Sequence, residues 1–351
     1  MKLTSENKSE LFSQIITLCN SNPQITINEV AEKCGISRQT ASKYIAELKK
    51  GNKIFKSYPR TYDDRMFVDT FEHDYTWLNG FMRNVRRYSK STAVIDPQTG
   101  KSWTYSALNS EANRFANALQ KRGLGKNDVV MSALRNCPAF AVSYVAPRKI
   151  GSILLAANAS LSSGEMALLM DHNQPKAVVY SANIIQTIIA ASKLTKCRNV
   201  LYILADNIEG KELPDGHVLY EDFIKGESDE NPKVDFRPHI YDEVLRLCTS
   251  GTTALPKSVP ISDINDVLSA HDVIMQYPLN RFDVTLNMTP WFHRGGCHCA
   301  GPGPVFYVGG TCVVMRDFKP SVTLEWVSKY KITFLMGAPT NLEMLYRAQE
   351  R

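Results

Sequence analysis

The feature that most constrains this sequence is an alternation of short apolar strands with amphipathic helices that begins near residue 75. Strand-like apolar runs cover 128–134, 152–157, 177–180 and 200–204, and helical periodicity appears at 110–119, 139–150 and 184–194. Strands that alternate with helices in this rhythm form βαβ units. The sequence therefore predicts an α/β fold with βαβ-type sheets covered by helices.

Composition narrows the class of protein further. The 351 residues allow two or three domains, and 44% hydrophobic with 22% charged residues excludes a disordered chain. The longest apolar stretches, such as 138–147, fall short of the ~18 residues that a membrane span needs. The polar amino terminus does not resemble a signal peptide, and the eight cysteines scatter among apolar neighbours. Reduced thiols and a cytoplasmic location are expected.

The first sixty residues have a different pattern, that of a helix-turn-helix. A helix is expected to end before Asn22, and a short second helix carries Val30 inward. Gly35 favours the left-handed turn that ends the second helix, and Ser37 caps a third. The pattern resembles the winged-helix DNA-binding domains of prokaryotic regulators, with residues 51–58 as a short wing.

The outward face of the third helix is basic and polar. Its candidate DNA contacts are Ser37, Arg38, Gln39, Thr40, Lys43 and Tyr44. Arginine and glutamine can bind base edges, and lysine neutralises phosphates. A small helical docking module with a solvated basic face would show the same pattern. DNA binding of this kind uses a dimer to span two half-sites, so a homodimer is also expected.

These patterns predict three regions: a helix-turn-helix domain over 1–60, a polar linker over 61–74, and an α/β domain over 75–351. The net charge of +6 is too small to indicate a partner by itself. The position of the basic residues is more informative than their number.

The segment 246–260 carries the clearest chemical signal, because an apolar strand runs into a turn rich in hydroxyls that ends at Lys257. Hydroxyls and exposed backbone N–H groups can surround phosphate oxygens, and a lysine adds positive charge. The spacing does not fit the Walker pattern. From the residues alone, a phosphate site and a polar hairpin turn are equally supported.

This segment resembles the T-S-G-T-T-G-x-P-K-G-V phosphate loop of the adenylate-forming superfamily, which includes acyl- and aryl-CoA ligases, luciferases and peptide-synthetase adenylation domains. Further motifs follow in the family's order at 103–119, 128–140, 149–162, 290–296, 309–318 and 334–340. The resemblance covers about residues 75–351. It implies an incomplete adenylation-domain core and an AMP-dependent carboxylate–CoA ligase.

By that resemblance, the phosphate contacts of ATP are Thr249, Ser250, Gly251, Thr252, Thr253 and Lys257. ATP with Mg²⁺ is the implied cofactor pair, and CoA is the implied co-substrate. Ala254 and Ser258 stand where the family has glycines, so a stiffer or reshaped loop is expected.

The resemblance also implies an acyl pocket lined by Trp291, Phe292 and His293, although His293 could equally be a packed histidine on a turn. Four potential zinc ligands lie between His293 and Cys299. Structural zinc sites usually combine two separated ligand pairs, so no metal site is expected here. A helix that buries Cys297 and Cys299 is the favoured interpretation.

Several segments of the family do not occur before Arg351: the aromatic-Gly-x-Thr-Glu segment for adenine and Mg²⁺, the Thr-Gly-Asp for ribose, and the small domain with the catalytic lysine. No complete catalytic set is therefore expected in these residues. Three hypotheses follow: a ligase with a fused DNA-binding module, a transcriptional regulator that uses a degenerate ligase core as a ligand sensor, and an incomplete fragment with an open, aggregation-prone sheet edge.

Overall fold

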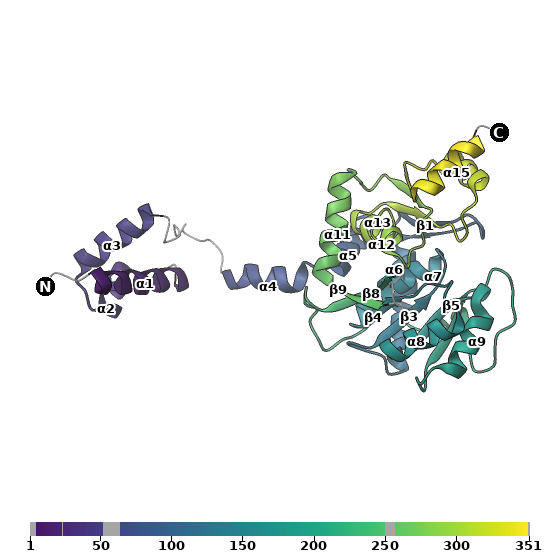
Figure 1. Cartoon of the computed structure of the whole chain (residues 1–351), viewed down its shortest axis with the longest axis horizontal. Helices are drawn as coiled ribbons and strands as arrows, with labels where there is room; N and C mark the ends of the chain where they lie inside the picture. Colours follow the sequence, from purple (N-terminus) through teal and green to yellow (C-terminus); the bar gives the residue numbers. More distant parts are fainter. Residues whose placement is uncertain (1–4, 23, 52–63, 250–256, 350–351) are drawn as a thin grey trace. The chain divides into compact units, whose positions relative to one another are not determined.

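The computed structural model describes residues 5–22, 24–51, 64–249 and 257–349. The chain divides into two compact units, Met1–Val68 and Asp69–Arg351 (Figure 1). Within the described ranges, no helix is long and apolar enough to cross a membrane. All eight cysteines are free thiols.

The amino-terminal unit is built from three helices: α1 (Ser5–Ser21), α2 (Ile27–Lys33) and α3 (Arg38–Lys50). Thr26 and Glu29 form a capping box that begins α2. Gly35 adopts φ +63° in the turn before α3, a conformation that favours glycine. The helices enclose a small apolar core of Leu11, Ile15, Val30, Ala31, Ala41 and Leu48. The predicted wing, residues 51–58, falls outside the described residues from 52 onward.

The segment that was expected to be a linker contains a helix, α4 (Asp64–Asp74). Its apolar side chains Met66, Phe67 and Val68 are exposed. The helix ends at Asp74, and the His73 ring forms a hydrogen bond with the Pro238 carbonyl within the larger unit. The polar composition of this segment concealed the helix, because amphipathic surface helices are also rich in polar residues.

The larger unit contains two sheets. The seven-stranded sheet has the order β7-β6-β5-β3-β4-β8-β9, and every neighbouring pair is parallel except β8 and β9. Its strands are β3 (Val129–Ala133), β4 (Ile153–Ala156), β5 (Ala177–Ser181), β6 (Leu201–Asp206), β7 (Val218–Leu219), β8 (Glu243–Thr249) and β9 (Lys257–Ser262). The five-stranded sheet has the order β12-β10-β11-β1-β2. Its strands are β1 (Thr92–Asp96), β2 (Lys101–Thr104), β10 (Val284–Asn287), β11 (Thr311–Val313) and β12 (Phe334–Met336).

Helices cover the sheets in layers, as the buried clusters show. Helices α6 (Tyr105–Lys121) and α7 (Pro138–Lys149) supply much of the core that both sheets share. Helices α8 (Ser163–Asn173) and α9 (Ile185–Leu194) cover the other face of the larger sheet. Helices α14 (Pro320–Lys329) and α15 (Pro339–Gln349) pack with β10 and β11.

The remaining helical segments of the larger unit are α5 (Trp77–Arg87), the 3-10 turn η1 (Ala182–Ile184), α10 (Tyr220–Ile224), α11 (Asp263–Gln276), α12 (Arg294–Cys297) and α13 (Pro302–Val308). The predicted α/β class is confirmed, with parallel sheets covered by helices. Parallel strands place their carboxyl ends at one edge of the sheet, which is where such folds bind ligands.

Candidate functional site

The end of the β8–β9 hairpin carries the two described residues of the predicted phosphate loop. Thr249 and Lys257 are cross-strand partners, and Thr249 Oγ1 donates a hydrogen bond to the Lys257 carbonyl over 3.4 Å. Both residues are exposed. Ser250, Gly251, Thr252 and Thr253 lie outside the described residues, as does Ala254. The structure thus defines the two strands between which the loop runs.

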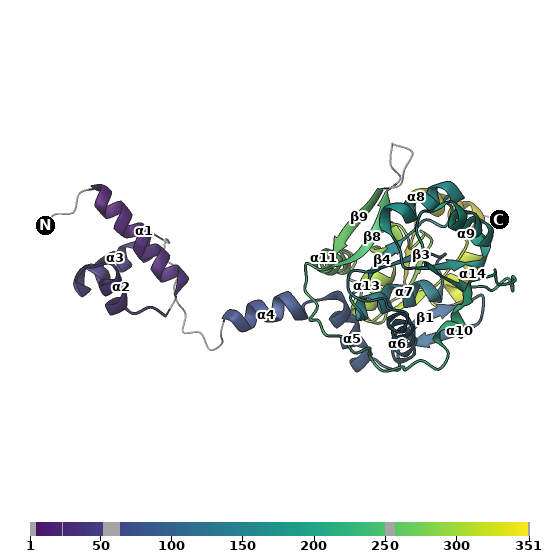
Figure 2. The same ribbon diagram turned by 90° about the horizontal axis from the view of Figure 1, so that it is seen from below.

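The stem of this hairpin is anchored in the larger sheet. Leu245 of β8 lies beside Leu154 of β4 in the parallel register, and both are buried. The Arg246 guanidinium donates to Glu243 over 2.6 Å and to Asn173 of α8 over 3.1 Å. Figure 2 shows β8 and β9 side by side at the margin of this sheet. The loop therefore starts from a fixed position at the carboxyl edge of the parallel strands.

A network of arginines and carboxylates lies at the same edge and connects the two sheets. Arg135, just after β3, donates to Asp206 over 3.1 Å and to Glu209 over 2.8 Å. Arg316 donates to Asp206 over 2.9 Å and to Asp96 of β1 over 2.8 Å. Burial works to raise the pKa of Asp96, but the hydrogen bonds and charge of Arg316 hold that pKa below its usual value. Arg135 lies within the motif at 128–140, but the sequence does not predict these partners.

The turn that follows β10 carries the residues of the predicted acyl pocket, and Asn136 holds it. The Asn136 amide donates to the carbonyls of Asn287 and Thr289 over 3.3 and 3.0 Å. Its Oδ1 accepts the backbone N–H of Trp291 over 2.7 Å. Two motifs about 150 residues apart in the chain, one at 135–140 and one at 290–296, are therefore joined by one buried side chain.

The three predicted pocket residues share this turn but occupy different environments. Trp291 is 1% exposed and packs edge-on against Phe140, with ring centroids 5.7 Å apart. Its indole N–H has no hydrogen-bond acceptor among the described residues. Phe292 is half-buried against the core that both sheets share. His293 is exposed and caps α12, where its Nδ1 accepts the Gly295 N–H over 3.3 Å.

A buried ionic cluster contacts the C-terminal end of α12 through His298. The Asp266 carboxylate accepts hydrogen bonds from Arg148 over 2.5 Å, from His298 Nε2 over 2.7 Å and from the Tyr144 hydroxyl over 2.8 Å. Burial works to raise the pKa of Asp266, but the Arg148 charge and the hydrogen bond from His298 keep it below its usual value. Sequence reasoning did not identify this cluster, because its members lie on three separate helical segments.

The packing of α12 also fixes the positions of the potential zinc ligands between His293 and Cys299. A Cβ atom at position 296 would lie 1.9 Å from the Pro290 carbonyl oxygen, so glycine is required there. Cys297 is buried in α12, but the helix ends before Cys299, which is only half-buried. The expectation of one helix burying both cysteines is therefore wrong for Cys299.

The exposed face of α3 carries most of the predicted DNA contacts. The Ser37 hydroxyl accepts the Thr40 N–H over 3.1 Å and so caps the helix. Arg38, Gln39 and Lys43 are exposed. Tyr44 is half-buried and packs edge-on against Phe12 of α1, with ring centroids 5.0 Å apart. The structure thus presents a basic helix face beside a tyrosine that also belongs to the small core.

One cavity of the described residues lies at the opposite end of the parallel strands. A cavity of about 560 Å³ is lined by residues 198–201, with Arg122, Leu124 and Lys176. These positions precede β5 and β6, at the amino ends of the strands. Ligands of open α/β sheets bind at the carboxyl ends of the strands, which favours the hairpin edge as the ligand site over this cavity.

Comparison with known families gives two matches. Residues 81–351 match the family described as AMP-binding enzyme. Residues 14–54 match winged helix-turn-helix DNA-binding domains. The two matches fall on the larger and the smaller unit, respectively.

Known relatives are similar to the larger unit. The crotonobetaine/carnitine–CoA ligase of Proteus sp. (strain LE138) is 32% identical over 258 residues, which cover 70% of this chain and 48% of that protein. The 4-coumarate–CoA ligase 3 of Oryza sativa subsp. japonica is 32% identical over 255 residues, which cover 70% of this chain and 43% of that protein. The chain spans about half the length of the curated relatives it matches.

Solved structures share the fold. The anthranilate CoA ligase AuaEII, in complex with anthranoyl-AMP, superposes with a TM-score of 0.70 at 21% identity and covers 77% of this chain and 51% of its own. Apo MbtA of Mycobacterium smegmatis superposes with a TM-score of 0.72 at 19% identity and covers 84% of this chain and 54% of its own. At these identities, the likeness concerns the fold.

Proposed function

The chain belongs to the family of AMP-binding enzymes, and on this premise we propose that it forms the amino-terminal part of a carboxylate–CoA ligase. The carboxylate of the substrate attacks the α-phosphorus of ATP, which forms an acyl adenylate and releases pyrophosphate. The thiol of CoA then attacks the acyl carbon and releases AMP. The substrate is an organic acid, and the cytoplasm, where ATP and CoA are available, is the proposed location.

The β8–β9 hairpin is the observation that carries this proposal. Thr249 and Lys257 bracket the loop at the carboxyl edge of the parallel sheet. In this proposal, Thr249, Ser250, Gly251, Thr252, Thr253 and Lys257 hold the β- and γ-phosphates. Their contribution is to position ATP and to stabilise the charge of the departing pyrophosphate.

Mg²⁺ would accompany ATP and neutralise part of its phosphate charge. Within the described residues, the carboxylates near the hairpin edge are already paired: Asp206 with Arg135 and Arg316, and Glu209 with Arg135. We assign neither of them to the ion, and CoA likewise receives no contact residue.

The turn after β10 is proposed to contribute to the acyl pocket. Phe292 and His293 lie on the turn that Asn136 holds, and Trp291 lies behind them in the core. The buried Trp291 N–H is an unused donor among the described residues. A substrate group that accepts this hydrogen bond would remove the cost of leaving the donor unpaired.

The amino-terminal unit is proposed to bind DNA, as a homodimer, through the exposed face of α3. Arg38, Gln39 and Lys43 are exposed there, and residues 14–54 match a DNA-binding family. Because lysine and arginine contacts to phosphates release counterions, binding should weaken steeply with salt.

Pyrophosphate exchange tests the enzymatic proposal. The complete protein is incubated with ATP, labelled pyrophosphate and a panel of short-chain, long-chain and aromatic carboxylates. Label should enter ATP in the presence of at least one acid. Lys257→Ala should reduce the rate of exchange, whereas Lys225→Ala, at an exposed lysine elsewhere in the chain, should leave that rate unchanged. Absence of exchange with every acid would contradict the proposal.

A ligand-sensing regulator is the second candidate, and the exposed basic face of α3 favours it. A mobility-shift titration against the DNA upstream of the protein's own gene tests this candidate. Sequence-preferring binding that an acid or nucleotide alters, together with no exchange, would support the sensor over the enzyme. Binding without sequence preference or salt dependence, or no binding at all, would reject DNA recognition.

A further inference from the structure

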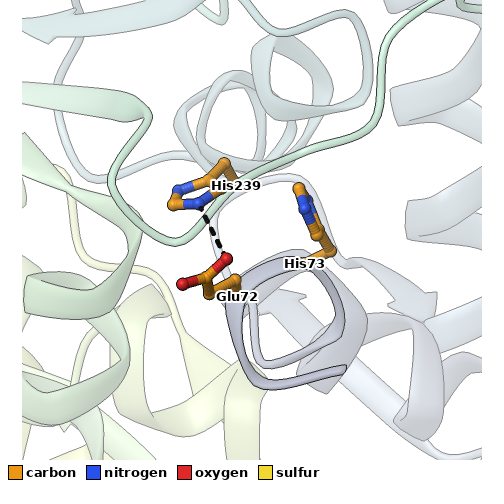
Figure 3. A group of neighbouring side chains, drawn as sticks. All are labelled: Glu72, His73 and His239. Carbon is orange, nitrogen blue, oxygen red and sulfur yellow. Dashed lines mark ion pairs between the residues drawn. The ribbon is translucent and has the colours of Figure 1, made fainter. Parts of the chain in front are cut away.

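A group of metal-binding side chains lies in the larger unit, away from the hairpin and from the turn after β10. Glu72 and His73 belong to the last turn of α4, and His239 belongs to the segment that precedes β8. All three are half-buried. Figure 3 shows the Glu72 carboxylate and the His239 ring facing each other, with the His73 ring beside them.

The spacing of the donor atoms suits a metal ion. One ligand atom from each residue lies within 4.8 Å of the other two. His239 Nε2 and Glu72 Oε2 are 3.6 Å apart, which is too long for a hydrogen bond. Two ligands of a tetrahedral zinc ion, each about 2.0–2.2 Å from it, are separated by roughly 3.4 Å. Small side-chain movements would bring the third ligand to the same separation.

The hydrogen bond of His73 prepares that ring for coordination. Its Nδ1 donates to the Pro238 carbonyl over 2.7 Å, because a carbonyl oxygen can only accept. The proton on Nδ1 leaves the lone pair on Nε2, which lies 4.0 Å from Oδ1 of Asp69. Metal-binding histidines commonly make this kind of hydrogen bond through their second nitrogen, which fixes the tautomer and the ring orientation.

Backbone hydrogen bonds hold the two sides of the group together. The Ile240 N–H donates to the Glu72 carbonyl over 2.8 Å, and the Ile264 N–H donates to the Ile240 carbonyl over 2.8 Å. The His239 N–H donates to Asp242 Oδ2 over 2.9 Å. The ligands are therefore carried by segments whose positions are already fixed, as a metal site requires.

We propose that Glu72, His73 and His239 bind one divalent transition-metal ion, with zinc as the best match to two imidazoles and one carboxylate. The ion would tie the last turn of α4 to the segment before β8. Arg237 already pairs with Asp69 over 2.6 Å, which leaves Glu72 as the carboxylate ligand. The Tyr241 N–H, which donates to His239 Nδ1 over 3.2 Å, must lose that acceptor when His239 binds metal through Nε2.

Equilibrium binding of zinc and cobalt to the full chain tests the site. After treatment with a chelator and buffer exchange, calorimetry with Zn²⁺ should show a site of one ion per chain. Glu72→Gln, His73→Gln and His239→Gln should each weaken the affinity by about tenfold or more, because each removes one of three ligands. The visible spectrum of bound Co²⁺ should lack the charge-transfer band of a thiolate ligand.

Two control variants separate this site from other donors. His172→Gln removes an exposed histidine of α8, and Cys299→Ser removes a half-buried thiol near His293. Neither should change the affinity of the proposed site. No binding at millimolar metal, binding that the three ligand variants leave unchanged, or binding that Cys299→Ser abolishes would each overturn the proposal.

Discussion

Helix α3 and the turn after β10 present their candidate residues in opposite ways. On α3, Arg38, Gln39 and Lys43 are exposed, and the helix needs only the Ser37 cap and a small core. In the turn after β10, the candidates depend on two buried side chains: Asn136, from the segment between β3 and α7, and Asp266, from α11.

This difference determines how a substitution in each region affects folding. The exposed face of α3 can lose a side chain with little effect on folding, since surface substitutions usually change stability by less than about 0.5 kcal/mol. The turn after β10 cannot lose its supporting side chains in this way, because they are buried polar groups that must keep their hydrogen-bond partners. The predictions below test that contrast, from the largest expected effect to the smallest.

Removal of the Asp266 carboxylate should have the largest effect. Asp266→Ala leaves the buried Arg148 guanidinium unpaired, so the free energy of unfolding of the larger unit should fall by about 3–5 kcal/mol. Denaturant titration of the full chain measures this loss. Asp272→Ala, at an exposed aspartate on the same helix, is the control and should change little. A loss below about 1 kcal/mol for Asp266→Ala would show that the cluster does not support the fold.

The pH dependence of stability should reveal a second buried carboxylate. Burial raises the pKa of Asp263 to about 6, against the ordinary 3.8. Between these two values the folded state holds a proton that the unfolded state has released, so this group lowers stability as pH rises from about 4 to about 6. The loss is about 3 kcal/mol if the full shift applies.

The variant Asp263→Asn should remove that loss while keeping an oxygen that accepts the Trp77 N–H. Its free energy of unfolding should exceed that of the wild type at pH 8, and the difference should disappear below pH 4. Unfolding curves measured across this range decide the matter. An equal pH dependence in both proteins would show that Asp263 is not the group responsible.

Loss of the Asn136 side chain should have an intermediate effect on stability and a large one on activity. Asn136→Ala removes three hydrogen bonds that hold the turn, which should cost about 2 kcal/mol. Pyrophosphate exchange should fall further than the folded fraction does, because the pocket residues lose their position. Asn183→Ala, at an exposed asparagine, serves as control. Unchanged exchange in Asn136→Ala would separate this turn from the acyl pocket.

The smallest effect is expected on α3. Ser37→Ala removes the N-cap, which should destabilise the amino-terminal unit by about 1 kcal/mol. Thermal unfolding followed by circular dichroism measures the change, with Ser42→Ala on the exposed side of the same helix as control. If both variants behave alike, the cap does not determine where α3 begins.

Much of the fold follows from the sequence for local reasons. The apolar runs at 128–134 and 177–180 correspond to β3 and β5, and the helices at 139–150 and 184–194 correspond to α7 and α9. Each of these segments shows its periodicity within a dozen residues. The order of the strands, and the presence of a second sheet, depend on pairings such as β1 with β11, which local patterns do not contain.

In the candidate site, too, local sequence patterns predict some features, and contacts between distant residues determine the others. Motifs identified the hairpin of Thr249 and Lys257 and the turn of His293, but they did not reveal what holds either one. Asn136 contacts the turn across more than 150 residues of sequence, and nothing in its own neighbourhood indicates that partner. The helix over Asp64–Asp74 did not stand out in the sequence, because its segment also contains many polar residues, as a linker does.

The affinity of the complete protein for ATP, measured by calorimetry in the wild type and in Lys257→Ala, tests the central claim most directly. If the β8–β9 hairpin holds the phosphates, Lys257→Ala should weaken ATP binding by about tenfold, which corresponds to the loss of one charge-assisted hydrogen bond. The affinity of Lys257→Ala for AMP should match that of the wild type. The control variant Lys225→Ala should bind ATP as the wild type does. Equal ATP affinity in wild type and Lys257→Ala, or no ATP binding at all, would contradict the assignment of this hairpin as the phosphate site.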